Sequence, residues 1–249
     1  MTAVSFARLN PDWKIKVHCS LSPCKEESWL SFEQKNSQYK GCDYFNKLSD
    51  ISNLKIIPWD FNTIGITNNI SEVFKSDIIR LHLLATEGGI WSDFDVYFFS
   101  SISALDCNTV ENKNKNTILC FQNGYHSIGF LGSSGNNKYF DELFQKSKIS
   151  LDKNKYQSIG RDLFRVQFSE VFNDVINLDF ENVYPVPWDK LDLIWGNSRF
   201  QWPSNTIGVH WFAGSPVTAQ IENEVDRSNL FKYKQSRLLN EIQRDLSLF

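Results

Sequence analysis

The chain has 249 residues, of which 41% are hydrophobic and 14% aromatic, and a chain of this length can bury roughly three quarters of its unfolded surface. We therefore expect one large domain with a substantial core. Its formal net charge is -3 at pH 7 and no basic cluster is present, which argues against nucleic-acid or anionic-membrane partners.

The cysteine pattern and the apolar runs exclude two further classes of protein. The five cysteines are odd in number and form no CxxC pair; they are Cys19, Cys24, Cys42, Cys107 and Cys120. This pattern favours neither a zinc site nor a disulfide framework, so we expect reduced thiols and a cytoplasmic location. The opening residues do not resemble a signal peptide and no segment has 18 uncharged apolar residues, so we expect no transmembrane segment.

Hydrophobic periodicity predicts the elements of the first third of the chain. Before residue 70 the pattern indicates a short helix up to residue 9, a strand over 13–21, a polar helix and loop region over 25–50, and a strand over 54–61 ended by its proline. The clearest helix begins at Ser71 or Ser76 and stops at Gly88 and Gly89. A strand must follow almost at once, because Ile90 is the first of several large apolar residues.

The rest of the chain continues the alternation of strands and helices. We predict a polar loop over 108–116, strands over 117–122 and 127–132, helices over 138–148 and 159–172, strands over 182–188 and near 207–211, and one or two C-terminal helices. There is no repeat and no linker. The prediction is therefore an α/β domain with mixed strands and helices on both faces.

Two aspartates stand at the start of a buried strand. In an extended segment, side chains two apart point the same way, so we expect Asp93 and Asp95 to face one side while Phe94 turns into the core. Neighbouring carboxylates repel unless a cation neutralises them, and Mg²⁺ or Mn²⁺ with open positions for phosphate oxygens is the natural ion. Two alternatives stay open: a solvated turn, and a phosphatase-like site in which the first aspartate is the nucleophile.

The segment "SDIIRLHLLATEGGIWSDFDV", residues 76–96, resembles the core signature of the DXD-containing sugar transferases of glycosyltransferase family 32. That signature has Ser-Asp, two apolar residues, Arg, a helix that ends at Gly-Gly, an aromatic residue and Asp-x-Asp. The resemblance implies a GT-A-like, Rossmann-type mixed sheet flanked by helices. It also implies transfer of a hexose from a nucleoside diphosphate sugar to a hydroxyl acceptor, with Mn²⁺ or Mg²⁺ and retention of anomeric configuration.

Asp77 and Arg80 are three residues apart and so lie on one helical face. Taken alone they indicate an intrahelical ion pair worth roughly 0.2–0.5 kcal/mol. The resemblance implies instead that they bind the donor, with Asp77 accepting hydrogen bonds from sugar hydroxyls and Arg80 reaching the sugar or the diphosphate.

A second match lies in "VHWFAGS", residues 209–215. The resemblance implies that His210 completes the metal shell beside Asp93 and Asp95. It further implies that the loop with Trp211, Gly214 and Ser215 closes on the diphosphate. Without the resemblance, a His followed by Trp is more often a packed core residue.

Other contacts are weaker candidates. Asn123 and His126 are candidate donor or acceptor contacts that could equally belong to a turn, and Trp188 is a candidate acceptor contact that could equally pack. Gly160 resembles a glycine beside the acceptor cleft, although Arg161 follows it where relatives carry proline.

The resemblance also sets the expected boundaries. Relatives open with a strand that precedes the first helix of this chain, so we expect a fold that lacks this first strand or obtains it from another segment. We expect a catalytic domain over 1–218 and a C-terminal helical extension over 219–249 packed on it. The donor would be a UDP- or GDP-hexose and the acceptor a glycan, lipid or protein; the alternative is a catalytically silent nucleotide- or glycan-binding module.

Overall fold

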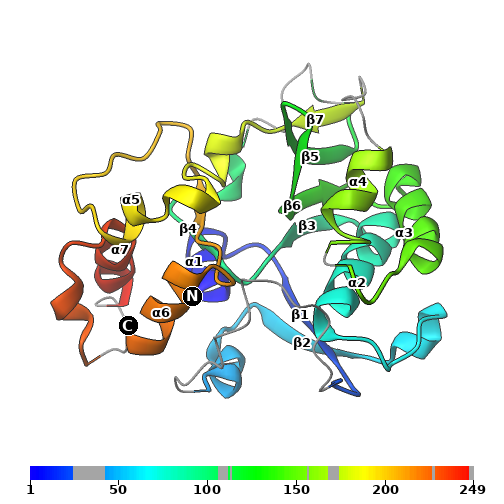
Figure 1. The fold of residues 1–249 in the computed structure, drawn as a ribbon, viewed down its shortest axis with the longest axis horizontal. Coiled ribbons are helices and arrows are strands. Elements are labelled where there is room, and N and C mark those ends of the chain that lie inside the picture. The colour runs from blue at the N-terminus through cyan, green and yellow to red at the C-terminus, as the bar shows by residue number, and fades with distance from the viewer. Residues whose placement is uncertain are drawn as a thin grey trace.

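The computed structural model describes residues 1–24, 43–105, 112, 114–155, 157–167, 174–225 and 228–246. Within these residues the chain forms helices together with parallel and antiparallel strands, which confirms the predicted α/β class (Figure 1). Most of the predicted region 25–50, much of the loop 108–116 and the end of the helix predicted over 159–172 lie outside the described residues.

The strands form three sheets. Parallel β1 and β2 make the first, the order β3-β6-β5-β7 makes the second, and antiparallel β4 and β8 make the third. In the second sheet only the pair of β5 with β7 is parallel. The bounds are β1 Ile15–Ser20, β2 Leu54–Trp59, β3 Gly89–Ser92, β4 Val96–Phe98, β5 Thr117–Gln122, β6 Tyr125–Ser133, β7 Val175–Asn177 and β8 Gly208–His210.

Helices α2, α3 and α4 lie together on one side of the second sheet (Figure 1). They are α2 Glu72–Thr86, α3 Lys138–Ser150 and α4 Arg161–Gln167. Ile78, Leu81 and Leu84 recur at helical spacing and are almost fully buried in a core that α2 shares with α3, β5 and β6. This core fixes α2, which carries Asp77 and Arg80, against the sheet.

The other end of the molecule is formed by α1 Thr2–Leu9, α5 Asp192–Trp195, α6 Pro216–Glu224 and α7 Arg237–Leu246 (Figure 1). Tyr97 of β4 and Val209 of β8 share a core with Leu238 and Ile242 of α7. The predicted C-terminal helices are therefore present as α6 and α7. The expected domain boundary between residues 218 and 219 lies inside α6.

The junction between α2 and β3 follows from its two glycines. The N–H groups of Glu87 and Gly88 both bond to the carbonyl of Leu83, and Gly88 and Gly89 have φ of 76° and 99°. A side chain at Gly88 would meet the backbone of Gly135 at 2.3 Å. The helix can therefore stop and the strand begin without a connecting loop, which aims β3 at the acidic turn. At the other end Ser71 is the N-cap residue, but its hydroxyl makes no capping bond.

Two predictions of local structure are wrong, and one strand was not predicted. Pro58 does not end its strand, because β2 continues to Trp59 on an edge where a missing N–H is tolerated. The strand predicted over 182–188 is absent: Pro185 and Pro187 lack an N–H. The segment accepts isolated backbone bonds, from Ile207 N–H at the Asn182 carbonyl and from His210 N–H at the Val183 carbonyl, and forms no ladder with β8. The strand that was not predicted is β7, Val175–Asn177, which lies shortly before that segment.

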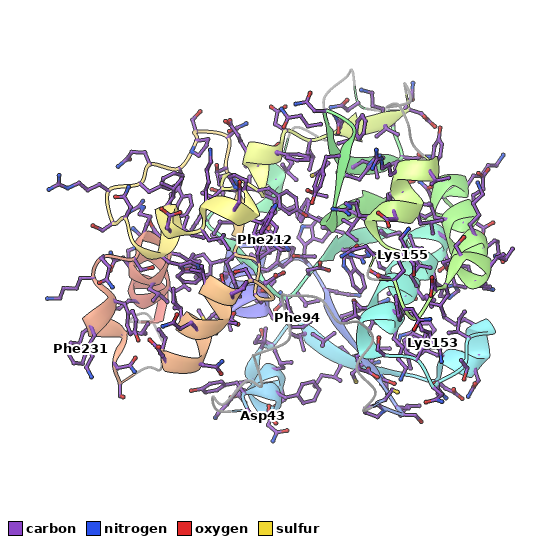
Figure 2. The ribbon with its side chains drawn as sticks, viewed as in Figure 1. Asp43, Phe94, Lys153, Lys155, Phe212 and Phe231 are labelled. Carbon is purple, nitrogen blue, oxygen red and sulfur yellow. The ribbon has the colours of Figure 1, made fainter. Side chains whose placement is uncertain are left out.

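Phe94 does not turn into the core. Its side chain is 57% exposed, because β3 ends at Ser92 and β4 begins at Val96, so residues 93–95 form a turn in which strand alternation does not hold. Asp93 and Asp95 point inward instead, with side chains 32% and 17% exposed. Figure 2 shows Phe94 and Phe212 in the middle of the molecule, between its two ends.

Candidate metal and donor site

The candidate site forms where the turn between β3 and β4 meets the end of β8. Val96 pairs with His210 across the β4–β8 ladder, so Asp95, one residue before Val96, lies beside the imidazole. His210 Nε2 is 3.0 Å from Asp95 Oδ1. One ligand atom from each of Asp93, Asp95 and His210 lies within 4.8 Å of the others, which brings His210 to two aspartates that stand at least 115 positions before it in the chain.

Asp95 is fixed by the loop that follows β8. The Ala213 N–H donates to Asp95 Oδ2 at 3.0 Å, and the Trp211 N–H donates to the Asp95 carbonyl at 2.9 Å. Burial would raise the pKa of Asp95, but the charge and hydrogen bond of His210 outweigh it and hold the pKa below its ordinary value. Asp95 is therefore a carboxylate at neutral pH.

Burial lowers the pKa of His210, yet Asp95 and then Asp93 raise it, and the net pKa lies above the ordinary value. The Phe212 N–H donates to His210 Nδ1 at 3.2 Å, with Phe212 at φ 51°. Because Nδ1 is an acceptor, the neutral ring carries its proton on Nε2 and donates it to Asp95. A cation bound at Nε2 would have to replace this proton.

Asp93 is anchored from two directions. Its Oδ1 accepts a hydrogen bond from Trp91 Nε1 at 2.8 Å and lies 3.4 Å from a terminal nitrogen of Arg80. Its backbone N–H donates to the Gly129 carbonyl at 2.7 Å. These bonds leave the second carboxylate oxygen, Oδ2, directed toward Gly129 and His210.

Arg80 joins the helix to the acidic turn. Its side chain is 3% exposed, and its terminal nitrogens also donate to Asp77 and, at 2.6 Å, to the Ile128 carbonyl. The Asp77–Arg80 pair is thus a buried ion pair and not the exposed helical pair of modest energy. Burial raises the pKa of Asp77 to about 6, against the opposing charge of Arg80. Arg80 therefore orients both Asp77 and Asp93.

Gly129 of β6 gives the site its room, and sequence reasoning missed it. A Cβ at this position would lie 2.9 Å from Asp93 Oδ2 and 3.0 Å from His210 Cδ2 and Nε2. A glycine inside a predicted strand is a signal of close approach by another group, which could have directed attention to it. The backbone at Gly129 forms one wall of the cluster.

Tyr184 is a second residue that sequence reasoning missed. Its ring lies 5.2 Å from that of His210, and only 8% of the residue is exposed. It belongs to the segment wrongly predicted as a strand, where its side chain had no assigned direction. No local pattern could have placed it beside His210.

Trp211, Gly214 and Ser215 were predicted to contact the donor, and all three lie in the segment that follows β8. Trp211 is buried and donates through Nε1 to Glu222 at 2.8 Å, and the Ser215 hydroxyl caps α6 by accepting the Thr218 N–H at 3.2 Å. Gly214 is half-buried in the turn between β8 and α6. The loop that contains them adjoins Asp95 through Ala213.

The remaining three candidates lie apart from the acidic cluster. Asn123 has φ 52° and forms, with Gly124, the two-residue turn of the β5–β6 hairpin, six residues before Gly129 on β6. His126 is buried with its ring 4.4 Å from that of Phe121, and Trp188 is 62% exposed in a short 3₁₀ helix. The structure does not bring these residues to Asp93 and Asp95.

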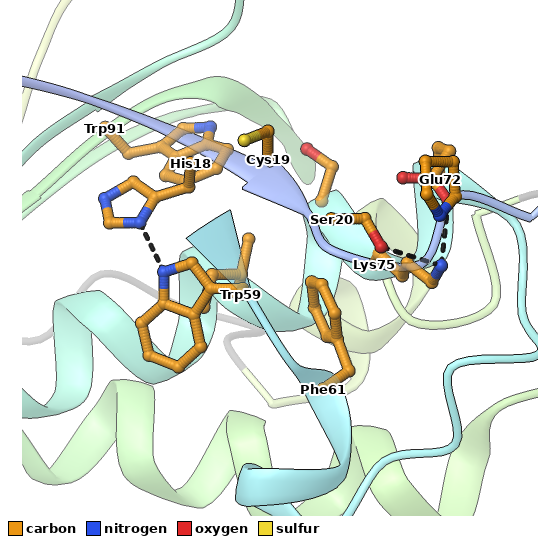
Figure 3. Close-up of a pocket in the computed structure, with 11 residues that line it drawn as sticks. His18, Cys19, Ser20, Trp59, Phe61, Glu72, Lys75 and Trp91 are labelled. Carbon is orange, nitrogen blue, oxygen red and sulfur yellow. Dashed lines mark hydrogen bonds and ion pairs between the residues drawn. The ribbon is translucent and has the colours of Figure 1, made fainter. Parts of the chain in front are cut away.

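A pocket of about 330 Å³ opens at the carboxyl ends of β1 and β2 (Figure 3). Trp59, Phe61 and Trp91 contribute aromatic surface; the other lining residues are His18, Cys19, Ser20, Pro23, Glu72, Lys75, Ser76 and Ile79. The carboxyl ends of parallel strands are where open α/β sheets bind ligands. Trp91 both lines this pocket and donates to Asp93, so the pocket adjoins the acidic cluster.

Lys75 fixes one rim of that pocket. It is almost fully buried, and its ammonium donates to Ser20 Oγ at 3.1 Å, to the Ser22 carbonyl at 2.7 Å and to Glu72 at 2.8 Å. These bonds tie the chain that leaves β1 to α2. Dashed lines in Figure 3 mark the Lys75 bonds to Ser20 and Glu72, and a further one joins Trp59 to His18.

A family model described as capsular polysaccharide synthesis protein matches residues 62–159. The match supports a transferase-type role in polysaccharide synthesis. It covers less than half of the chain and includes Asp77, Arg80, Asp93, Asp95 and Gly129, while His210 lies outside it. Searches of curated proteins and of solved structures found no match.

Two further findings concern membrane-spanning helices and the cysteines. Among the described residues, no helix combines the length and apolar character that crossing a bilayer requires. Cys19, Cys24 and Cys120 are free thiols, while Cys42 and Cys107 lie outside the described residues.

Proposed function

We propose that this chain is a metal-dependent glycosyltransferase that moves a hexose from a nucleoside diphosphate sugar to a hydroxyl acceptor during polysaccharide synthesis. The observation that carries the proposal is the convergence of Asp93, Asp95 and His210 within 4.8 Å. It is supported by the capsule-synthesis match over residues 62–159 and by the pocket beside Trp91.

The donor set suits a small divalent cation. Carboxylate oxygens are ligands that both Mn²⁺ and Mg²⁺ prefer, and the imidazole favours Mn²⁺ over the harder Mg²⁺. Gly129 leaves space beside them that a side chain would fill. Asp95 and His210 would hold the ion directly, with Asp93 binding the ion, its water or the ribose of the donor. A bound ion neutralises a diphosphate and stabilises the departing nucleoside diphosphate.

Metal binding carries a cost at His210. Coordination through Nε2 would place the ring proton on Nδ1, which would break the bond from the Phe212 N–H. The ion would also replace the Nε2 proton that now bonds to Asp95. Metal affinity should therefore fall as the pH is lowered.

The pocket at β1 and β2 would take the nucleoside, since Trp59 and Phe61 offer aromatic surface and Trp91 leads to Asp93. The diphosphate would then lie at the cluster, with the loop of Trp211, Gly214 and Ser215 beside it. Arg80 would act by orienting Asp77 and Asp93, because its two terminal nitrogens already bond to protein oxygens. Asp77 would contact the sugar.

The expected stereochemistry of the transfer rests on the resemblance of residues 76–96 to the family 32 signature. We propose retention of anomeric configuration, as in glycosyltransferase family 32. No side chain is assigned as general base, because the leaving phosphate can itself accept the acceptor's proton.

The test is hydrolysis of a panel of UDP- and GDP-sugars with and without Mn²⁺, because donors of this kind lose sugar slowly to water. We expect Mn²⁺-dependent release with the parent protein and its loss in Asp95→Asn. Asp12→Asn, at an exposed turn, is the matched control and should behave as the parent does. Equal hydrolysis by Asp95→Asn would show that the metal role is wrong, and nucleotide binding without turnover of any donor would support a silent binding module.

A further inference from the structure

The hydroxyl of Tyr184 is a buried donor without a partner. It makes no hydrogen bond to any residue that the structure describes, although the residue is 8% exposed. Buried polar side chains are nearly always hydrogen-bonded, because leaving one unpaired costs the free energy of its lost hydration. The unpaired Tyr184 hydroxyl therefore suggests a hydrogen-bond partner outside the protein.

Its surroundings point to the metal and donor cluster. The Val183 carbonyl accepts the His210 N–H at 2.8 Å, so the backbone before Tyr184 runs beside β8. The Tyr184 and His210 rings lie 5.2 Å apart, tilted by 33°. The phenol is thus packed on the imidazole from the side of residues 180–184.

The phenol can act as a donor in this position. A tyrosine hydroxyl keeps its proton at physiological pH and is a neutral O–H donor. An unpaired O–H on a ring packed against His210 suits an electronegative ligand oxygen bound at the cluster.

We propose that the Tyr184 hydroxyl donates a hydrogen bond to an oxygen of the ligand held by Asp93, Asp95 and His210. That oxygen belongs to the diphosphate of the donor or to water on the metal. This inference rests on the proposed function and adds a ligand-binding residue to it. The cost of the unpaired hydroxyl in the free protein is recovered when the ligand arrives, so the site is preorganised for it.

The test is Tyr184→Phe, which keeps the ring against His210 and removes only the hydroxyl. We expect the melting temperature to stay equal to or above that of the parent, because no hydrogen bond is lost. We expect the Kd for Mn²⁺, or for the nucleotide in the presence of Mn²⁺, to rise roughly 10- to 100-fold, as for loss of a hydrogen bond to a charged group. Calorimetric titration with Mn²⁺ alone, then with UDP and GDP in the presence of Mn²⁺, separates metal-bound water from a diphosphate oxygen.

Tyr97→Phe is the matched control. Tyr97 is 1% exposed, and its hydroxyl donates to the Glu241 carbonyl at 3.3 Å, away from the cluster. Removing it should lower the melting temperature by roughly 2–4 °C and leave Mn²⁺ and nucleotide binding unchanged. Tyr184→Phe should therefore lose binding without losing stability, and Tyr97→Phe should lose stability without losing binding.

The outcomes separate the two proposals. If the parent binds Mn²⁺ or a nucleotide and Tyr184→Phe binds it equally well, the role of Tyr184 is overturned and the proposed function stands. A marked loss of stability in Tyr184→Phe would also overturn it, since the hydroxyl would then have a structural partner. If the parent binds neither Mn²⁺ nor UDP nor GDP, the proposed function fails and the role of Tyr184 fails with it.

Discussion

Replacing Gly129 by alanine is the sharpest mutational test of the cluster. The added Cβ would stand 2.9 Å from Asp93 Oδ2, a distance that real Cβ atoms essentially never show, and 3.0 Å from His210 Nε2, which is tighter than most Cβ contacts in proteins. Neither neighbour can retreat freely, because Asp93 is bonded to Trp91 and His210 to Asp95. We expect a stability loss of about 1–3 kcal/mol, as for other overpacked sites.

The functional loss should exceed what the stability loss explains. Pushing Asp93 and His210 apart disturbs two candidate metal ligands at once, and misplaced ligands typically lower metal affinity roughly 10- to 100-fold. The assay is calorimetric titration with Mn²⁺, together with thermal unfolding of the same preparation. A folded Gly129→Ala protein with parental Mn²⁺ affinity would show that Asp93 and His210 do not bind the ion together.

Gly132→Ala supplies a control from the same strand. A Cβ at Gly132 would lie 2.9 Å from both Ile118 Cδ1 and Ile90 Cδ1, so the added methyl group would make similarly close contacts, but with apolar side chains. We expect a comparable loss of stability with unchanged Mn²⁺ affinity. Parallel loss of Mn²⁺ binding in both variants would show a general effect of strand distortion and not a property of the cluster.

Three further predictions concern charge and burial. Asp77→Ala leaves the buried Arg80 short of a counter-charge and should cost about 3–5 kcal/mol; a melting temperature within a degree of the parent would instead fit a purely donor-binding Asp77. The pKa of Asp77 is raised from 3.8 to about 6, so the folded state holds its proton more tightly and stability falls as pH rises between these values. Asp77→Asn should remove that part of the slope in urea unfolding at pH 4 to 7, whereas an unchanged slope would assign it to other groups. Burial raises the pKa of Cys120 to about 12, so at pH 8 a thiol reagent should modify half-buried Cys19 well before Cys120; equal rates by mass spectrometry would contradict this.

Local patterns predicted the elements that hold the site. Helical spacing of apolar residues and a double glycine placed α2 and its stop, and apolar runs placed β5, β6 and the strand of His210. Each of these signals is confined to a few neighbouring residues, where periodicity and turn chemistry decide the outcome. The proximity of Asp77 and Arg80 was predictable for the same reason.

The environment of the cluster was not predictable in this way. The turn at residues 93–95 exposes Phe94 because β3 and β4 belong to different sheets, a choice made by tertiary pairing and not by local alternation. The burial of Asp77 and Arg80, the nearness of Gly129 to His210 and the packing of Tyr184 on His210 all join residues distant in sequence. One sequence carries no direct signal of such contacts.

Crystals grown with Mn²⁺ and UDP, with data collected at the manganese absorption edge, would show whether one cation binds between the acidic turn and the imidazole of His210. We predict a single strong anomalous peak coordinated by the Asp95 carboxylate and His210 Nε2, with the uridine in the pocket at β1 and β2. Manganese bound elsewhere, with Asp95 and His210 still joined to each other, would contradict it.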